Sequence, residues 1–306
     1  NSTNKIAGVA EPLAIDNVDT LHMALGGIVT GLTKLQKYKT VCFVEGEDDI
    51  SYIRMLSDAL KRNGSTYTND IDKVSFWYIR GKDNLRLKIM AGKQLLSQAV
   101  SGCKFNSIFD KDYSTIAANE TYISRQIKPT LGSTAKIHTH NGYCIESVLF
   151  SDLDILDTYI RKQIPYALSH PVDEAITPQN IDVKHFIENH CNNLKNSISN
   201  VTSCLYLDMK SKFLSQKKPQ RPELKDVEFD AFAAESSRRV QFLMNKNNIA
   251  DFIHAIEQEI GGYLFERDDE ESETLSSKLL INYFQTINND DELYPSFISL
   301  LESLTV

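Results

Sequence analysis

Carboxylates gather at two points of this sequence, each directly after a short apolar run. Glu45 follows the run Val41–Val44, Asp49 comes one helical turn later, and Asp110 and Asp112 follow a second run further along the chain. Carboxylates that meet repel one another unless a cation neutralises them, and hard oxygen ligands suit Mg²⁺ or Mn²⁺. The residues therefore predict a divalent metal site, provided that both runs end at the same place in the fold.

The apolar runs have the composition of buried strands in a parallel sheet. Val41–Val44 is continuous, β-branched and aromatic, as expected for a strand covered on both faces. The same reasoning predicts further strands over Val74–Ile79, Ser107–Phe109 and Ala135–His138, and helices over Ile50–Leu60 and Leu85–Val100. Strands alternating with helices indicate an α/β fold, and parallel sheets bind ligands at the carboxyl ends of their strands.

Other acidic residues nearby have two interpretations. Glu146 lies in the apolar segment Tyr143–Phe150, where an acid is seldom buried without a partner. We favour a metal-site role for Glu146, and a water-facing position on an amphipathic helix is the alternative. Glu47 and Asp48 are better explained as solvated residues at a helix N-terminus, where negative charge is favourable.

The ordered set of carboxylates resembles the TOPRIM fold of topoisomerases, bacterial primases, RecR-type repair proteins and OLD-family nucleases. In that family a Glu ends the first strand, as Glu45 does, and an Asp-x-Asp ends a later one, as Asp110-Lys111-Asp112 does. The OLD-like branch and the bacterial DUF4435 proteins, which include the nuclease subunit of the PARIS anti-phage system, add two features. These are an acidic residue matched by Asp49 and a Tyr-x-Ile-Glu segment matched by Tyr143–Leu149.

The resemblance implies a Rossmann-like, mainly parallel sheet and a metal-dependent endonuclease that hydrolyses nucleic-acid phosphodiester bonds. Glu45, Asp110 and Asp112 are the implied catalytic residues. All the matched carboxylates are implied ligands of one or two Mg²⁺ or Mn²⁺ ions: Glu45, Asp49, Asp110, Asp112 and Glu146. The relatives further imply an antiviral defence effector, an ABC/AAA-type ATPase as partner and transfer RNA as one candidate target, with DNA equally open.

The match has three departures. Ser147 stands where Asn is usual, and Asp49 stands where many members carry Glu. OLD nucleases also use a lysine late in the fold, for which Lys136 and Lys162 are the candidates.

The alternative function is a catalytically silent TOPRIM-like subunit that binds or regulates an ATPase complex. A nucleotide-binding domain is disfavoured, because no glycine-rich phosphate cradle follows the first strand.

The resemblance covers about residues 38–155, and the apolar spacing of the remaining residues completes a division of the chain into three parts. Residues 1–37 form an N-terminal segment with an amphipathic helix, 38–155 the TOPRIM catalytic domain, and 156–306 a mainly helical region. Helices are expected in that last region over Leu153–Ile164, Asp182–Ile198, Val201–Leu214, Phe229–Leu243, Asn247–Ile260, Ser276–Ile287 and Leu293–Leu304.

The charge of the chain limits how it can bind nucleic acid. The formal net charge of -8 argues against a surface that grips nucleic acid as a whole. Local basic groups remain: the segment Lys210–Lys225, and Arg80, Lys82 and Lys111 near the predicted sheet edge. The acidic run Glu266–Glu273 would repel nucleic acid and is interpreted as a solvated loop or a protein contact.

The five scattered cysteines fit reduced thiols in a cytoplasmic protein. The apolar stretch Leu21–Leu32 is too short and too polar to cross a bilayer, so no membrane partner is expected, and a homo-oligomer is left open. His138 and His140 are interpreted as structural, and His185 and His190 lack zinc-site spacing.

Overall fold

The structure is a computed structural model. It describes residues 40–64, 71–87, 89–90, 104–112, 116–131, 135–173, 181–199, 244–267, 274–289 and 292–304. The predicted amphipathic helix within 1–37, the helices expected over 201–214 and 229–243, the basic segment Lys210–Lys225 and most of the acidic run Glu266–Glu273 lie outside these residues.

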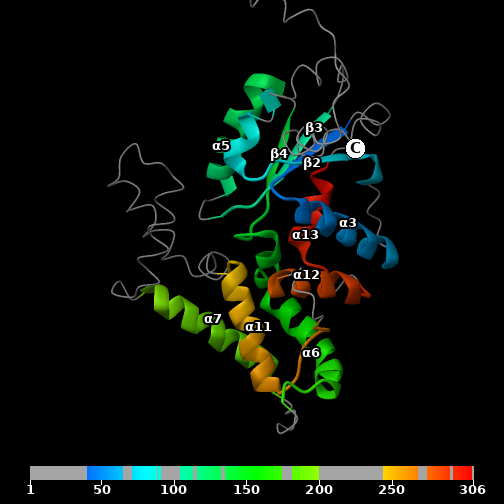
Figure 1. The fold of residues 1–306 in the computed structure, drawn as a ribbon, viewed down its shortest axis with the longest axis vertical. Helices are drawn as coiled ribbons and strands as arrows, with labels where there is room; N and C mark the ends of the chain where they lie inside the picture. Colours follow the sequence, from blue (N-terminus) through cyan, green and yellow to red (C-terminus); the bar gives the residue numbers. More distant parts are fainter. Residues whose placement is uncertain are drawn as a thin grey trace, which may run out of the picture.

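A parallel sheet forms the upper part of the molecule in Figure 1. Its strands are β1 (Thr40–Val44), β2 (Ser75–Tyr78), β3 (Lys104–Phe109) and β4 (Lys136–Thr139). The order is β2-β1-β3-β4, and every neighbouring pair is parallel. The strands predicted from the apolar runs are therefore confirmed, and the α/β fold class with them.

Side chains along the central strand β1 alternate between two hydrophobic layers. Val41 and Phe43 face one layer, and Cys42 and Val44 face the other, as the period of two in a strand requires. The first layer is completed by α5 (Ile116–Leu131), which lies beside β4 and was not predicted from the sequence. Both faces of the sheet are buried, which explains the continuous apolar runs.

The second layer is completed by α3 (Glu47–Arg62), which begins directly after Gly46. Carboxylates occupy its first turn and Lys61 and Arg62 its last, the distribution that a helix dipole favours. A helix was expected over Leu85–Val100, on the other side of β1. The structure describes residues 85–87 and 89–90 of it, which are helical and follow a short 3-10 helix at Lys82–Asn84. The segment that carries Glu146 is also a 3-10 helix, Ile145–Phe150.

Five further helices follow among the described residues. They are α6 (Leu153–Ser169), α7 (Val183–Ser199), α11 (Lys246–Ile260), α12 (Leu275–Thr286) and α13 (Pro295–Glu302). Figure 1 shows α6, α7 and α11 at the end of the molecule away from the sheet, with α12 and α13 in between. The mainly helical character of 156–306 as a whole stays a prediction, since residues 200–243 are not described.

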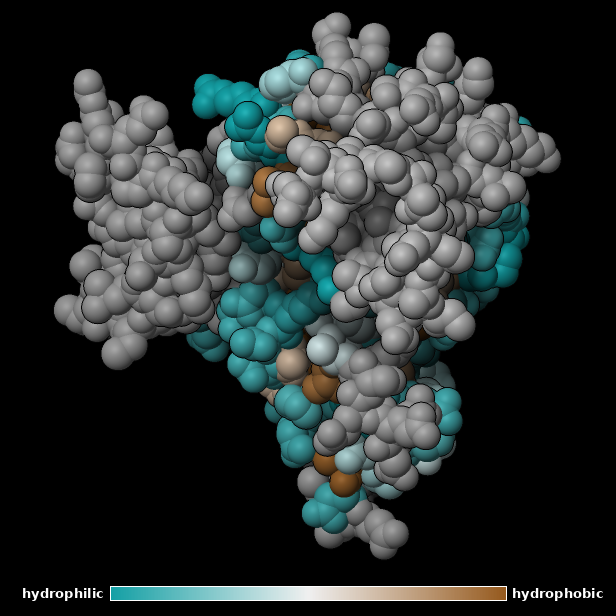
Figure 2. Space-filling view, turned by 45° about the horizontal axis from the view of Figure 1, so that its top comes forward, coloured by the Kyte–Doolittle hydropathy of each residue, from teal (hydrophilic) through white to brown (hydrophobic). Residues whose placement is uncertain are grey.

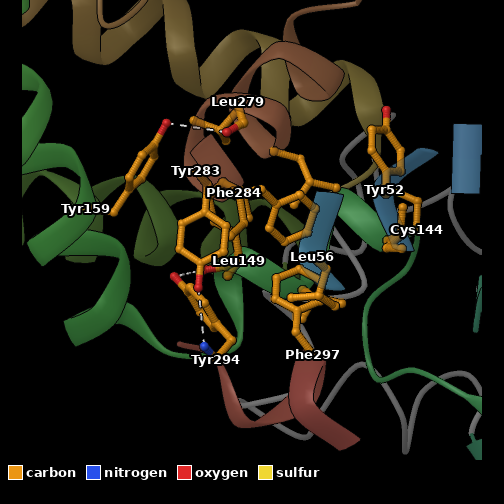
Figure 3. Close-up of a cluster of buried hydrophobic side chains, with 14 of the residues drawn as sticks. Tyr52, Leu56, Cys144, Leu149, Tyr159, Leu279, Tyr283, Phe284, Tyr294 and Phe297 are labelled. Atoms are coloured by element: carbon orange, nitrogen blue, oxygen red, sulfur yellow. Dashed lines mark hydrogen bonds between the residues drawn. The ribbon is translucent and has the colours of Figure 1, made fainter. Parts of the chain in front are cut away.

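One hydrophobic core joins the sheet to these helices. Figure 3 shows Phe297 of α13 and Tyr283 of α12 packed toward Leu56 of α3 and the segment that holds Leu149. Tyr283 makes edge contacts with Tyr159 of α6 at a ring separation of 5.5 Å. The domain boundary expected at residue 155 is crossed by this core, and the division itself stays a prediction.

A buried hydroxyl ties α13 to the 3-10 helix at Ile145–Phe150. The hydroxyl of Tyr294 donates a hydrogen bond of 2.6 Å to the carbonyl oxygen of Leu149. We expect Tyr294→Phe to lower the free energy of unfolding by about 1–3 kcal/mol, because a buried carbonyl loses its partner. Urea unfolding checks this, with Tyr122→Phe on the exposed face of α5 as the matched control. Equal stability of the two variants would contradict it.

The surface in Figure 2 is mostly hydrophilic where the structure describes it, and its hydrophobic residues appear as small separate patches. No helix among the described residues is long and apolar enough to cross a membrane. The arrangement of charged groups at the sheet edge is therefore the feature to examine for function.

Candidate functional site

The carboxyl edge of the sheet brings the predicted carboxylates together. Glu45 follows β1, and Asp110 and Asp112 follow the adjacent strand β3. The two strands are parallel, with Val44 opposite Ile108, so these residues lie at the same edge of the sheet. Asp49 joins them from the first turn of α3, where its Oδ2 accepts a hydrogen bond of 2.8 Å from the backbone N–H of Gly46. Asp112 has a positive φ of 50°, a conformation in which Asp and Asn are enriched.

Burial, with the charges of neighbouring carboxylates as a second cause, raises the pKa values of three of these groups. Burial raises the pKa of Glu45 to about 9, and the charge of Asp110 adds to this effect. Burial followed by the charge of Asp112 raises the pKa of Asp110 to about 8. Burial and the charge of Asp110 raise the pKa of Asp49 to about 7. These shifts show that the group is electrostatically unfavourable when all its members are charged.

Lys82 places an ammonium group among these carboxylates. Its Nζ lies 2.5 Å from Oδ2 of Asp112 and 3.9 Å from Oε2 of Glu45. The same Nζ donates a hydrogen bond of 2.5 Å to the carbonyl oxygen of Asp110. The side chain of Lys82 is 11% exposed, so the interaction takes place largely out of water, where charges interact strongly.

An unusual turn after β2 brings Lys82 to this position. Arg80 and Gly81 both have positive φ, 53° and 93°. The N–H of Arg80 donates to the carbonyl oxygen of Glu45 at 2.9 Å, and the side chain of Asn84 donates to the carbonyl oxygen of Arg80 at 2.6 Å. The turn is therefore fastened to the residue that carries the central carboxylate.

Two further polar residues hold Asp110. His140, which follows β4, has its Nε2 2.7 Å from Oδ1 of Asp110. Asn119 of α5 donates to the carbonyl oxygen of Asp110 at 2.9 Å and to Oγ1 of Thr139 at 3.0 Å. His140 was predicted to be structural, and its contact with Asp110 places it at the site. Its position one residue past a strand was the signal that could have found it.

Glu146 is fully buried and is paired with a lysine from the distant helix α11. Nζ of Lys246, the first residue of that helix, lies 3.0 Å from Oε1 of Glu146. Oε2 of Glu146 is buried without a hydrogen-bond partner. The charge of Glu146 raises the pKa values of Asp49 and Asp110, which indicates that it lies near the other carboxylates.

Neither lysine expected to act late in the fold joins this group. Lys136 is the first residue of β4, at the opposite edge of the sheet. Lys162 lies in α6 and forms an ion pair with Glu292. Lys82 and Lys246 are the lysines that the structure pairs with the predicted carboxylates. Of the other expected basic groups, Arg80 is exposed, whereas Lys111 is buried.

The donor atoms at this edge have the chemistry that Mg²⁺ or Mn²⁺ requires, and they include a buried Oε2 of Glu45 without a hydrogen-bond partner. Their arrangement is different from a closed metal cage. Among the described residues, no three His, Cys, Asp or Glu side chains are grouped so as to hold an ion. The cation that the structure shows beside the carboxylates is Lys82.

No protein family, curated protein or solved structure matches this chain. The resemblance to TOPRIM nucleases therefore stays a prediction based on the residues quoted above, and the parallel sheet is the part of it that the structure shows.

Proposed function

We propose that this protein is a metal-dependent nuclease that hydrolyses nucleic-acid phosphodiester bonds. The observation that supports it best is the meeting of Glu45, Asp49 and Asp110 at one sheet edge with raised pKa values. Strongly perturbed carboxyl groups at the carboxyl edge of a parallel sheet are typical of functional sites. A fold gains nothing in stability from such repulsion, so a cation-dependent function is the simplest reason for it.

In this proposal Glu45, Asp110 and Asp112 hold Mg²⁺ or Mn²⁺, with Asp49 and Glu146 as further ligands. The bound metal supplies an activated water and neutralises charge on the phosphate. His140 and Asn119 fix the position of Asp110 by hydrogen bonds to its side chain and its backbone.

The exposed guanidinium of Arg80 lies on the turn next to Glu45. The guanidinium lies over the ring of Tyr78, 5.7 Å from its centroid, and guanidinium groups suit phosphate oxygens. We assign Arg80 to substrate binding and the carboxylates to the metal.

The setting of this activity follows from the resemblance alone. We place the protein among bacterial anti-phage defence effectors, with an ABC/AAA-type ATPase partner that restrains or activates the nuclease. Transfer RNA is the first substrate to test, beside single-stranded and duplex DNA.

Direct binding of Mn²⁺ tests the site independently of any substrate. We expect wild type to bind Mn²⁺ in isothermal titration calorimetry, and we expect Glu45→Gln to lose most of that affinity because a central ligand is neutralised. Glu47→Gln is the matched control, since Glu47 is exposed at the start of α3. Equal loss in both variants, or binding by Glu45→Gln as tight as by wild type, would contradict the assignment.

A silent TOPRIM-like subunit is the second candidate. It is favoured by the ammonium of Lys82, which already neutralises Asp112 at 2.5 Å without any metal. A silent subunit should bind no Mn²⁺ and should show the same cleavage, at background level, in wild type and Glu45→Gln. Metal binding by wild type separates the two functions.

A further inference from the structure

Lys82 has a position that neither a surface ion pair nor a simple substrate contact explains. Its Nζ is bonded to an oxygen of Asp112, lies 3.9 Å from Oε2 of Glu45 and donates to the carbonyl oxygen of Asp110. These are three of the residues that would surround a divalent cation. An ammonium at this point lowers the pKa values of Glu45 and Asp110 against the effect of their neighbours.

We infer that Lys82 is the countercharge that holds the carboxylates together in the metal-free protein, and that divalent cations bind in competition with it. The competition with divalent cations rests on the proposed function. The role of Lys82 as a countercharge concerns the metal-free chain and does not depend on catalysis. An ammonium and a divalent cation at the same carboxylate repel each other, so binding of one at Asp112 weakens binding of the other.

Few of the groups around Lys82 lose a hydrogen bond when its ammonium moves away. The carbonyl oxygen of Asp110 also accepts a hydrogen bond from Asn119 at 2.9 Å, and keeps that partner when Lys82 moves. Oε2 of Glu45 has no hydrogen bond to lose. Asp112 loses a bonded partner, which an incoming metal would replace, and Oδ1 of Asn119 loses a longer hydrogen bond of 3.4 Å. The flexible aliphatic chain of lysine permits the ammonium to swing toward solvent.

The position of the turn argues that this arrangement is built into the fold. Arg80 and Gly81, the two residues before Lys82, both have positive φ. Glycine adopts this conformation readily, whereas for Arg80 it carries a conformational cost. The backbone of the turn is bonded to Glu45 by the N–H of Arg80 at 2.9 Å. The backbone at Lys82 and the backbone at Glu45 are therefore held in a fixed relative position.

The first test is a double-mutant cycle on the metal-free protein, with EDTA present. Lys82→Met removes the ammonium and keeps a long side chain, and Asp112→Asn removes the closest carboxylate in a conformation that Asn adopts well. We expect Lys82→Met to lower Tm by roughly 3 °C or more. We expect the double variant to lose less stability than the two single variants lose together, because each single variant already removes the interaction between Lys82 and Asp112.

Lys61→Met is the matched control for the loss of one positive charge. Lys61 is exposed on α3, and its Nζ lies 3.9 Å from Asp58 and 4.0 Å from Asp72. We expect little change in Tm from this substitution, since exposed ion pairs contribute little. Additive effects of Lys82→Met and Asp112→Asn, or an equal loss of Tm in Lys61→Met, would overturn the countercharge.

The second test is the affinity for Mn²⁺ by titration calorimetry. Competition predicts that Lys82→Met binds Mn²⁺ about tenfold or more tightly than wild type, whereas Lys61→Met binds it as wild type does. Lys82→Arg, which keeps the charge, should stay close to wild type. Affinity that is unchanged or weaker in Lys82→Met would overturn the competition, whatever the cycle shows.

The two proposals fail in different ways. If neither wild type nor Lys82→Met binds Mn²⁺, the nuclease proposal and the competition are both overturned, and the countercharge is still decided by the cycle in EDTA. If both bind Mn²⁺ but Lys82→Met gains no affinity, the nuclease proposal survives and the competition does not.

Discussion

Replacing Glu45 with Gln should lower metal-dependent cleavage by about 10²-fold or more, the range found when a charge-stabilising group is removed from a reacting centre. Glu45 directly follows the central strand and lies near Asp110 and Lys82, so its carboxylate is among the proposed metal ligands. Gln keeps the size of the side chain and removes the negative charge. The loss should therefore appear in catalysis and metal affinity rather than in folding.

The measurement is the rate of cleavage of transfer RNA, single-stranded DNA and duplex DNA with Mn²⁺, followed on denaturing gels. Glu47→Gln is the control because Glu47 is exposed two residues further along the chain. Circular dichroism should show both variants folded. Cleavage by Glu45→Gln at the wild-type rate would remove Glu45 from the site and would contradict the proposed function.

The metal-free protein should lose stability as the pH rises. The pKa values of Glu45, Asp110 and Asp49 are raised from 4.5, 3.8 and 3.8 to about 9, 8 and 7. The folded state therefore holds protons that the unfolded state has released. These three groups contribute stability at low pH that is lost as the pH rises to about 9. Burial lowers the pKa values of His138 and His140 from 6.5 to about 4, so these two groups act in the opposite direction below about pH 6.5. The net fall in stability is therefore expected from about pH 6.5 to about pH 9.

Chemical denaturation in EDTA at several pH values measures this slope. Glu45→Gln should be more stable than wild type at high pH by about 1–3 kcal/mol, because it removes one of the mutually repelling groups. Mg²⁺ or Mn²⁺ should reduce the slope in wild type, since a bound cation replaces the missing protons. Stability that rises with pH between about 6.5 and 9 in EDTA would contradict the raised pKa values of these buried carboxyl groups.

Several features of the sheet edge were predictable from the sequence because their cause is local. A continuous apolar run such as Val41–Val44 has few other stable environments than a buried parallel strand, and residues that follow such strands must share one edge. This reasoning predicts from the sequence that Glu45, Asp110 and Asp112 lie at one edge of the sheet. It also predicted α3, whose charges follow the helix dipole.

The parts that were missed depend on contacts that sequence patterns do not record. Lys82 reaches the carboxylates because two successive residues, Arg80 and Gly81, adopt positive φ, and the pattern around Gly81 indicates a turn without indicating its direction. Lys246 meets Glu146 across 100 positions of the chain. Helix α5 was not predicted either, and with it the role of Asn119 beside Asp110.

The hydrogen bond from Tyr294 to Leu149 gives the end of the chain a thermodynamic connection to the site. The 3-10 helix that ends at Phe150 carries both Leu149, which accepts this bond, and the buried Glu146. Local unfolding of α13 would remove a partner from that segment and expose part of the shared core. The position of Glu146 is thus coupled to the folding of the last described helix, so that this carboxylate and α13 belong to one cooperative unit.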